Sequence, residues 1–281
     1  NFVVIKVGVE GIPPLFLASL RFAFSVFPAI FLVKKPEASF GSLAAYGLLL
    51  GVGEFGLLFT AIKLGAPPGL CSVLLQSQAF FTAIFGAVFM KEKLGPHNIA
   101  GMGIAGAGLL LFGLASASGS ADSAGFSPVL VAMVLAAAAS WAGANVVARA
   151  MPRTGGFGLM VWSSLFSPLP LAGLSLVIEG PGAIARSLSA IQPITVGALA
   201  YLVVLSTLVG YGLWNALIMR HGAGKIAPFS LMVPVFALVF SILFLKESFG
   251  LAEGAASLLV LIGLLVHVFG SRVWASRGAI R

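Results

Sequence analysis

Apolar residues occur along the chain in long runs, and short groups of Gly, Pro and charged residues separate these runs. A helix needs about 20 apolar residues to cross a bilayer, so each run predicts one membrane-spanning helix. Ten spans are expected, near residues 1–9, 13–33, 43–62, 68–90, 97–115, 127–148, 157–178, 193–218, 224–245 and 251–270. The first run is short, and we expect it to be the second part of a truncated helix.

One polar stretch divides these spans into two sets of five. Residues 116–126 are rich in Ser, Ala and Gly, as is typical of a linker. The expected domains are therefore a five-helix unit over residues 1–115 and a second five-helix unit over residues 127–271. A short basic tail, residues 272–281, follows the second unit and is expected in the cytoplasm.

The composition supports a bilayer environment. Hydrophobic residues make up 59% of the chain, charged residues only 9%, and the mean hydropathy is +1.10. Soluble domains carry about a quarter charged residues to cover their surface, so this chain is expected to face lipid. The net charge of +8 is spread over the loops, which excludes the contiguous basic patch of a nucleic-acid-binding protein. A single cysteine, Cys71, excludes a disulfide framework.

A stretch of the first unit recurs in the second at a constant spacing. Residues 85–110 and 240–265 align without a gap. The identical pairs are Phe85/Phe240, Phe89/Phe244, Lys91/Lys246, Glu92/Glu247, Gly95/Gly250, Ala100/Ala255, Gly108/Gly263, Leu109/Leu264 and Leu110/Leu265. A match at fixed spacing indicates two copies of one unit. Because Glu92 and Glu247 fall at span ends, we expect them to pair with neighbouring lysines and to cap the following helix.

The distribution of Lys and Arg predicts the orientation of the spans. If the N-terminus is cytoplasmic, the inside segments hold eleven of these residues and the outside loops hold three; Lys6 and Arg21 lie in or beside helices and are not counted. This bias predicts that both termini are cytoplasmic. Since five is an odd number, the second unit must cross the membrane in the opposite direction to the first.

Two oppositely oriented copies of one unit are typical of secondary transporters, whose halves move about a central site. We therefore expect an all-α integral membrane protein with ten helices in two inverted five-helix repeats around a central cavity. The cavity is expected among spans 1, 3, 4, 6, 8 and 9, which hold most of the intramembrane polar and aromatic groups. A membrane receptor or scaffold is the alternative from another class, but it has no need of inverted copies. The pattern implies no oligomer.

The chain resembles the EamA-type branch of the drug/metabolite transporter superfamily. The resemblance lies in the opening Asn1-Phe-Val-Val-Ile-Lys6, in Pro14-Leu-Phe-Leu-Ala-Ser-Leu-Arg21-Phe22 and in the twin Lys-Glu span ends. Within that branch it is most similar to the YddG-like exporters of aromatic amino acids and related metabolites. The resemblance implies a multi-pass protein of a bacterial inner membrane that exports amino acids. A multidrug or other metabolite exporter of the same superfamily is the alternative.

Three polar residues in the third and fourth spans are candidates for substrate binding. Glu54 is an acid well inside an apolar run, and ionisable groups at membrane depth usually face a cavity or a partner. It could couple transport to protons, anchor a substrate amine or be a structural acid. Gln76 and Gln78 are two residues apart, so on a helix their side chains point about 200° apart and one is expected to face the cavity. Interhelical hydrogen bonding is the alternative for both.

Further candidates lie on the first, sixth, seventh and eighth spans. Tyr211, Trp214 and Asn215 share one helix face at i, i+3 and i+4 spacing. The remaining candidates are Asn145, which follows Trp141 at i+4 spacing, its counterpart Asn1 in the resemblance, and Trp162. Aromatic belts at the membrane surface are the alternative for the tryptophans. With few fixed charges at membrane depth, such a cavity suits neutral, zwitterionic or aromatic molecules rather than highly anionic ones.

The motifs predict no enzyme, cofactor or metal. Gly101-Met-Gly103-Ile-Ala-Gly106 matches a dinucleotide-binding pattern, but it lies inside an apolar run rather than after a strand, so close helix packing is expected. The chain has no cluster of metal ligands, no nucleophile with a paired base and no phosphate-binding loop in a credible context. The expected partners are a small-molecule substrate and the lipid bilayer.

Overall fold

The computed structural model describes residues 1–117, 127–151, 156–222 and 226–278, and every regular element in these ranges is helical. The first half contains α1 (Phe2–Gly11), α2 (Pro14–Ala29), α3 (Phe40–Gly47), the π-helical η1 (Leu48–Gly56), α4 (Leu57–Lys63), α5 (Pro68–Leu75), α6 (Gln78–Met90) and α7 (Pro96–Ala117). The second half contains α8 (Pro128–Ala150), α9 (Gly156–Ser164), α10 (Pro168–Ile178), α11 (Pro181–Ser189), α12 (Pro193–Ala200), the π-helical η2 (Tyr201–Val209), α13 (Gly210–His221), the short 3₁₀ helix η3 (Ala227–Leu231), α15 (Met232–Leu245) and α16 (Leu251–Gly278).

Six helices in the described ranges are long and apolar enough to cross a membrane, at residues 40–63, 68–90, 96–115, 128–150, 193–221 and 251–270. Two bent helix pairs raise the number to as many as eight: α1 with α2, bent by 114°, and α9 with α10, bent by 42°. The predicted span at 224–245 is present as a shorter apolar helix over Phe229–Leu245. A multi-pass helical protein is therefore confirmed, whereas the count of ten spans stays a prediction.

Two segments predicted to lie outside the spans begin as helix, while the domain bounds stay a prediction. The predicted linker begins inside a helix, because α7 runs to Ala117, and residues 118–126 lie outside the described residues. The predicted tail also begins as a helix, since α16 extends to Gly278, while residues 279–281 are not described. The hydropathy pattern missed α11, a helix of nine residues that buries none of its side chains.

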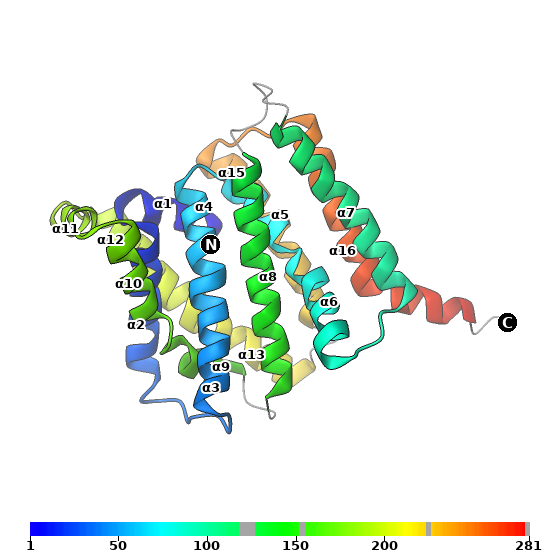
Figure 1. Ribbon diagram of the computed structural model, residues 1–281, viewed down its shortest axis with the longest axis horizontal. Coiled ribbons are helices and arrows are strands. Elements are labelled where there is room, and N and C mark those ends of the chain that lie inside the picture. Colours follow the sequence, from blue (N-terminus) through cyan, green and yellow to red (C-terminus); the bar gives the residue numbers. More distant parts are fainter. Residues whose placement is uncertain (118–126, 152–155, 223–225, 279–281) are drawn as a thin grey trace.

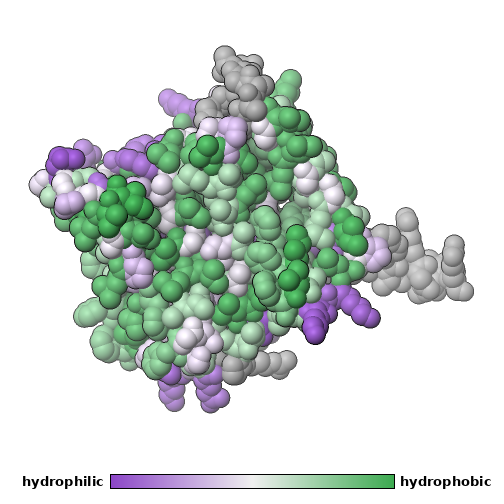
Figure 2. Space-filling model, in the orientation of Figure 1, coloured by the Kyte–Doolittle hydropathy of each residue, from purple (hydrophilic) through white to green (hydrophobic). Residues whose placement is uncertain are grey.

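The outer surface is predominantly apolar. Figure 2 shows hydrophobic residues over most of the visible face, with hydrophilic ones toward its edges. Large apolar side chains such as Phe31, Phe89 and Phe244 are more than two-thirds exposed. A surface of this kind would associate in water, and lipid tails are its natural solvent.

Helix α8 lies near the centre of the molecule and packs against η1, α3, α4, α5 and α6 (Figure 1). The largest cluster of buried apolar side chains fills the space between α1, α4, α5 and α8. Helices α7 and α16 pack along each other at one side of the molecule, and Phe112, Ala256 and Val260 join them to the same cluster. The site lies between α8 and other helices of both halves.

The glycine-rich motif of α7 lies in a helix–helix contact. A Cβ atom added to Gly101 would lie 2.5 Å from the carbonyl oxygen of Gly263 on α16, and one added to Gly263 would lie 2.6 Å from the carbonyl oxygen of Gly101. Only glycine at both positions allows the two backbones to come so close. The predicted role in close helix packing is thereby confirmed for Gly101, while Gly103 and Gly106 face open space.

This contact gives a stability test. Gly101→Ala is expected to lower the stability of the α7–α16 pair by about 1–3 kcal/mol, because backbone atoms of α16 must move to admit the methyl group. Gly103→Ala is the matched control on the same helix; with no neighbour to meet, it gains helix propensity of at most about 1 kcal/mol. Thermal unfolding of the purified variants in one detergent measures the difference. Equal melting temperatures would contradict the packing assignment.

The repeated sequence has the same local structure in both halves. Lys91 and Lys246 both adopt the left-handed backbone conformation, with φ of 56° and 55°. After them, the backbone N–H groups of Glu92 and Glu247 donate to the carbonyls of Gly86 and Ser241 at 3.2 and 3.3 Å. The helix that precedes each lysine therefore ends with the same backbone conformation and the same hydrogen bond in both halves, as expected for two copies of one unit.

The predicted partners of the twin acids are wrong. Glu92 forms its ion pair with Arg149 on α8, at 2.9 Å, and Glu247 accepts a hydrogen bond from the backbone N–H of Gly69 on α5 at 3.3 Å. The left-handed lysine before each acid turns the chain, and the carboxylates reach neighbouring helices instead of the next one. The following helices are capped by Asn98 and Glu253, which accept from the backbone N–H groups of Gly95 and Gly250 at 2.9 Å each.

Candidate functional site

A cavity of about 480 Å³ lies between helices of both halves. Its lining residues are Asn1, Phe2, Arg21, Glu54, Phe55, Leu58, Ser72, Leu75, Gln76, Gln78, Trp141, Asn145, Ser206, Tyr211, Trp214, Ser230 and Val233. All six of the spans expected at the cavity contribute, and α2 contributes as well through Arg21. A concave site with apolar walls and a few converging polar groups is typical of a small-molecule pocket.

The structure brings most of the predicted binding residues together. Those at the cavity are Asn1, Glu54, Gln76, Gln78, Asn145, Tyr211 and Trp214. Trp162 is not among its lining residues: its indole N–H donates to the backbone carbonyl of Val33 at 2.9 Å, and its ring packs beside Leu43 and Met151. The side chain of Asn215 lies outside the described residues. A role in substrate binding stays a prediction for all of these residues.

Both glutamines line the cavity, although a straight helix would have turned one of them away. The helix is broken between them: α5 ends at Leu75, and α6 begins at Gln78. The backbone N–H groups of Gln76 and Ser77 donate to carbonyls three residues earlier, in a tight turn that changes the angle between successive side chains. The expectation that a single glutamine faces the cavity is therefore wrong.

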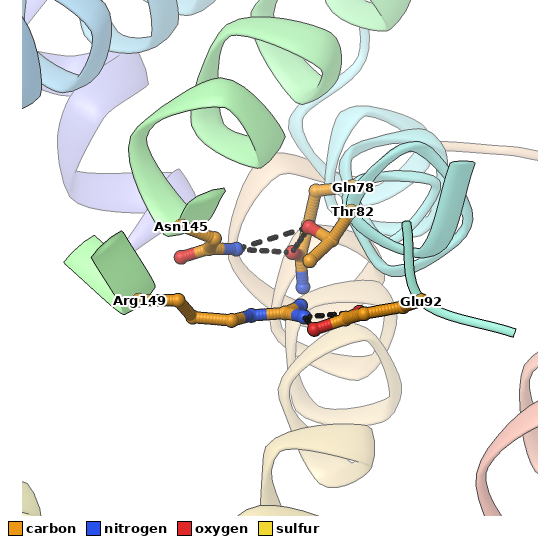
Figure 3. A network of polar contacts seen from close by, with 5 residues as sticks. All are labelled: Gln78, Thr82, Glu92, Asn145 and Arg149. Atoms are coloured by element: carbon orange, nitrogen blue, oxygen red, sulfur yellow. Dashed lines mark hydrogen bonds and ion pairs between the residues drawn. The ribbon is translucent and has the colours of Figure 1, made fainter. Parts of the chain in front are cut away.

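A hydrogen-bonded network joins α6 to α8 beside the cavity (Figure 3). The amide nitrogen of Asn145 donates to the side-chain oxygens of Gln78 at 2.9 Å and Thr82 at 3.2 Å. Next to it, the ion pair between Glu92 and Arg149 links the segment that follows α6 to α8. The amide oxygen of Gln78 thus accepts a hydrogen bond from another helix, which is the alternative role expected for the two glutamines. Its side chain also lines the cavity.

Two π-helical segments carry polar groups to the cavity. Glu54 lies in η1 and Ser206 in η2, in the third and eighth predicted spans. Ser140 donates to the backbone carbonyl of Leu49 in η1 at 2.7 Å, and Thr207 donates to that of Leu202 in η2 at 2.7 Å. Such side-chain donors satisfy carbonyls that irregular helix leaves free in an apolar environment. Short π-helical stretches are frequent at functional sites.

Arg21 is the main residue of the cavity that the sequence reasoning set aside. It lies on α2, is only 1% exposed, and its Nε donates to the Thr207 hydroxyl at 3.0 Å. The ring of Phe55 covers the guanidinium, with 4.1 Å from its carbon to the ring centre. The signal was available: an arginine inside an apolar run rarely faces lipid, and it usually lines a cavity or meets a partner.

Comparison with known proteins shows relatives along the whole chain. The profile of the EamA-like transporter family matches residues 1–114 and, a second time, residues 129–269. The chain is 42% identical to a probable amino-acid metabolite efflux pump of Salmonella typhimurium, over 97% of this chain and 91% of that protein. It is 39% identical to a protein of the same description from Escherichia coli, with the same coverage. A crystal structure 18% identical in sequence shares the fold with a TM-score of 0.56, over 94% of this chain and 92% of the other.

The family matches cover both halves, and the helical, lipid-facing architecture with its internal cavity agrees with them. The chain belongs to the EamA-like transporter family.

Proposed function

We propose that this protein is a secondary transporter that exports aromatic or neutral amino acids and related small metabolites across a bacterial inner membrane. The observation that carries the proposal is the cavity of about 480 Å³, lined by polar and aromatic groups from both halves of an apolar helical shell. A cavity at this place suits a small molecule on its way through the membrane. The efflux pumps of Salmonella typhimurium and Escherichia coli support the choice of cargo.

The transport mechanism we propose is alternating access between two inverted five-helix repeats, residues 1–115 and 127–271. Two matches to one family profile support the repeat, and so do the equal helix ends at Lys91 and Lys246. The π-helical segments in the third and eighth predicted spans are further support. The topology we propose has ten spans, as the apolar runs predict, and cytoplasmic termini, as the distribution of Lys and Arg predicts.

Energy coupling has two routes in this proposal. In the first, Glu54 exchanges a proton while the cavity opens to each side in turn, which its buried position beside the cavity supports. In the second, the cargo moves down its own gradient or exchanges for a counter-substrate, and Glu54 has no part in coupling. The response of transport to a pH gradient separates these routes.

The cargo can be tested in growing cells. Overexpression is expected to raise tolerance to toxic amino-acid analogues and dipeptides, because an exporter lowers their concentration in the cytoplasm. Cells that carry the empty vector are the control, and a blot of the membrane fraction confirms that the protein is present. Unchanged tolerance to the analogues together with resistance to unrelated drugs would favour a multidrug exporter of the same superfamily.

A further inference from the structure

Two opposite charges line the same cavity without touching each other. Arg21 on α2 and Glu54 in η1 both border it, and their exposed fractions are 1% and 3%. Among the described residues, the structure has an ion pair between Arg149 and Glu92 but none between Arg21 and Glu54. An isolated charge at membrane depth is costly, so each of these groups calls for a partner.

Each group keeps a buried polar atom without a hydrogen bond. For Arg21 it is Nη1, although the Nε of the same side chain is bound to Thr207. For Glu54 it is Oε2. Buried polar atoms in folded proteins are almost always paired, so an unpaired one beside a cavity calls for a partner such as a bound ligand or a water molecule.

The surroundings of Arg21 hold its guanidinium in a defined orientation. The Phe55 ring covers one face at 4.1 Å, and Thr207, itself bound to the Leu202 carbonyl, fixes the Nε edge. What remains for a ligand is the edge that carries Nη1. A planar guanidinium edge matches the two oxygens of a carboxylate.

We propose that Arg21 and Glu54 determine substrate specificity by binding the two charged ends of a zwitterionic amino acid. Arg21 binds the α-carboxylate through Nη1, and Glu54 binds the α-ammonium through Oε2. The inference rests on the proposed transport function and names the feature that the cargo must carry, namely both α-groups free. A zwitterion neutralises both protein charges at once, whereas an amide or a deaminated acid leaves one of them unpaired.

Three ligands that share one side chain test this proposal: L-phenylalanine, L-phenylalaninamide and 3-phenylpropanoate. Binding to the purified full chain is followed by the fluorescence of Trp141 and Trp214, which both line the cavity. We expect phenylalanine to bind at least roughly tenfold more tightly than either analogue, as the loss of one charge-assisted hydrogen bond requires. Three equal affinities, or no binding of any ligand, would overturn the proposal.

Two variants test which residue binds the carboxylate of the ligand and which binds its ammonium group. Arg21→Gln should abolish the preference for phenylalanine over its amide and keep the preference over 3-phenylpropanoate, and Glu54→Gln should do the reverse. A uniform loss of affinity for all three ligands in both variants would show that the residues are only structural. Arg21→Lys keeps the positive charge, so it should restore part of the preference that Arg21→Gln loses. If a variant fails to fold, the three ligands measured on the unsubstituted chain still test the proposal.

Failure of the proposed transport function can be distinguished from failure of the proposed zwitterion site. If the chain in liposomes moves none of the three ligands but still binds phenylalanine selectively, the transport function fails and the binding site stands. If phenylalanine is transported but its amide and 3-phenylpropanoate compete equally well, the zwitterion site fails and transport stands.

Discussion

Protein with Glu54→Gln is expected to fold and to exchange substrate for substrate, and, where transport is coupled through the Glu54 proton, to lose all accumulation of substrate above equilibrium. Glutamine keeps the size of the side chain, so the wall of the cavity should be preserved. It also keeps an oxygen that accepts a hydrogen bond, so an ammonium group should still bind, although more weakly. Glutamine has no proton that titrates, whereas a coupling group must change its protonation while each side of the membrane has access to it in turn. Exchange at saturating substrate therefore survives, and uphill transport does not.

The measurement compares liposomes with and without an imposed pH gradient. The control is Glu37→Gln, since Glu37 is an exposed acid between α2 and α3. In the unsubstituted chain and in the control, the gradient should raise both the rate and the final level of substrate. If the unsubstituted chain ignores the gradient, Glu54 has no part in coupling and the cargo moves by facilitated diffusion or exchange.

Gly47→Ala is expected to have the largest effect on stability. The added Cβ would lie 2.0 Å from the backbone oxygen of Ser163 and 2.9 Å from its carbonyl carbon, where α3 crosses α9. A backbone cannot rotate away as a side chain does, so the two helices must separate, at a cost of about 3 kcal/mol or more. The change also disturbs the carbonyl of Gly47, which accepts a hydrogen bond from the Ser167 hydroxyl at 2.9 Å.

Helix propensity predicts the opposite sign, which makes this test sharp. Alanine in place of glycine stabilises an unobstructed helix by up to about 1 kcal/mol. Gly41→Ala on the same helix is the control, because the nearest atom to its added Cβ is the Ser39 hydroxyl at 3.8 Å. Size-exclusion chromatography after graded heating should show early loss of the Gly47→Ala protein and no loss for Gly41→Ala. Equal heat resistance of the two variants would contradict the tight α3–α9 crossing.

Periodicity, composition and the family resemblance were sufficient to predict an all-helical membrane protein, and seven of the nine predicted binding residues line its cavity. Apolar run lengths find helices well, because the thickness of the bilayer sets the length of each span. They do not find breaks within a run. The turn at Gln76 and Ser77 lies inside apolar surroundings, without a proline or glycine to mark it, so the angle between Gln76 and Gln78 could not be derived from the sequence.

Trp162 and Arg21 show that contacts between distant parts of the chain could not be derived from the sequence. Trp162 was a candidate because it lies within a span, but only the structure gives the carbonyl of Val33 as its partner, away from the cavity. Arg21 was left out of the topology count although its place inside an apolar run was a sign of a buried role, but its partner Thr207 lies 186 residues away and could not be derived from the sequence. Long-range pairings of this kind follow from the packing of helices and not from the local pattern.

Counterflow tests the central claim, that this chain carries amino acids across a membrane through the central cavity. Liposomes containing the purified chain are loaded with unlabelled L-phenylalanine and diluted into a trace of labelled L-phenylalanine. The account predicts transient accumulation of label inside these liposomes and not inside protein-free ones, and a clear reduction with Arg21→Gln. Flux equal to that of protein-free liposomes for phenylalanine and for every other amino acid and small metabolite tried would contradict it.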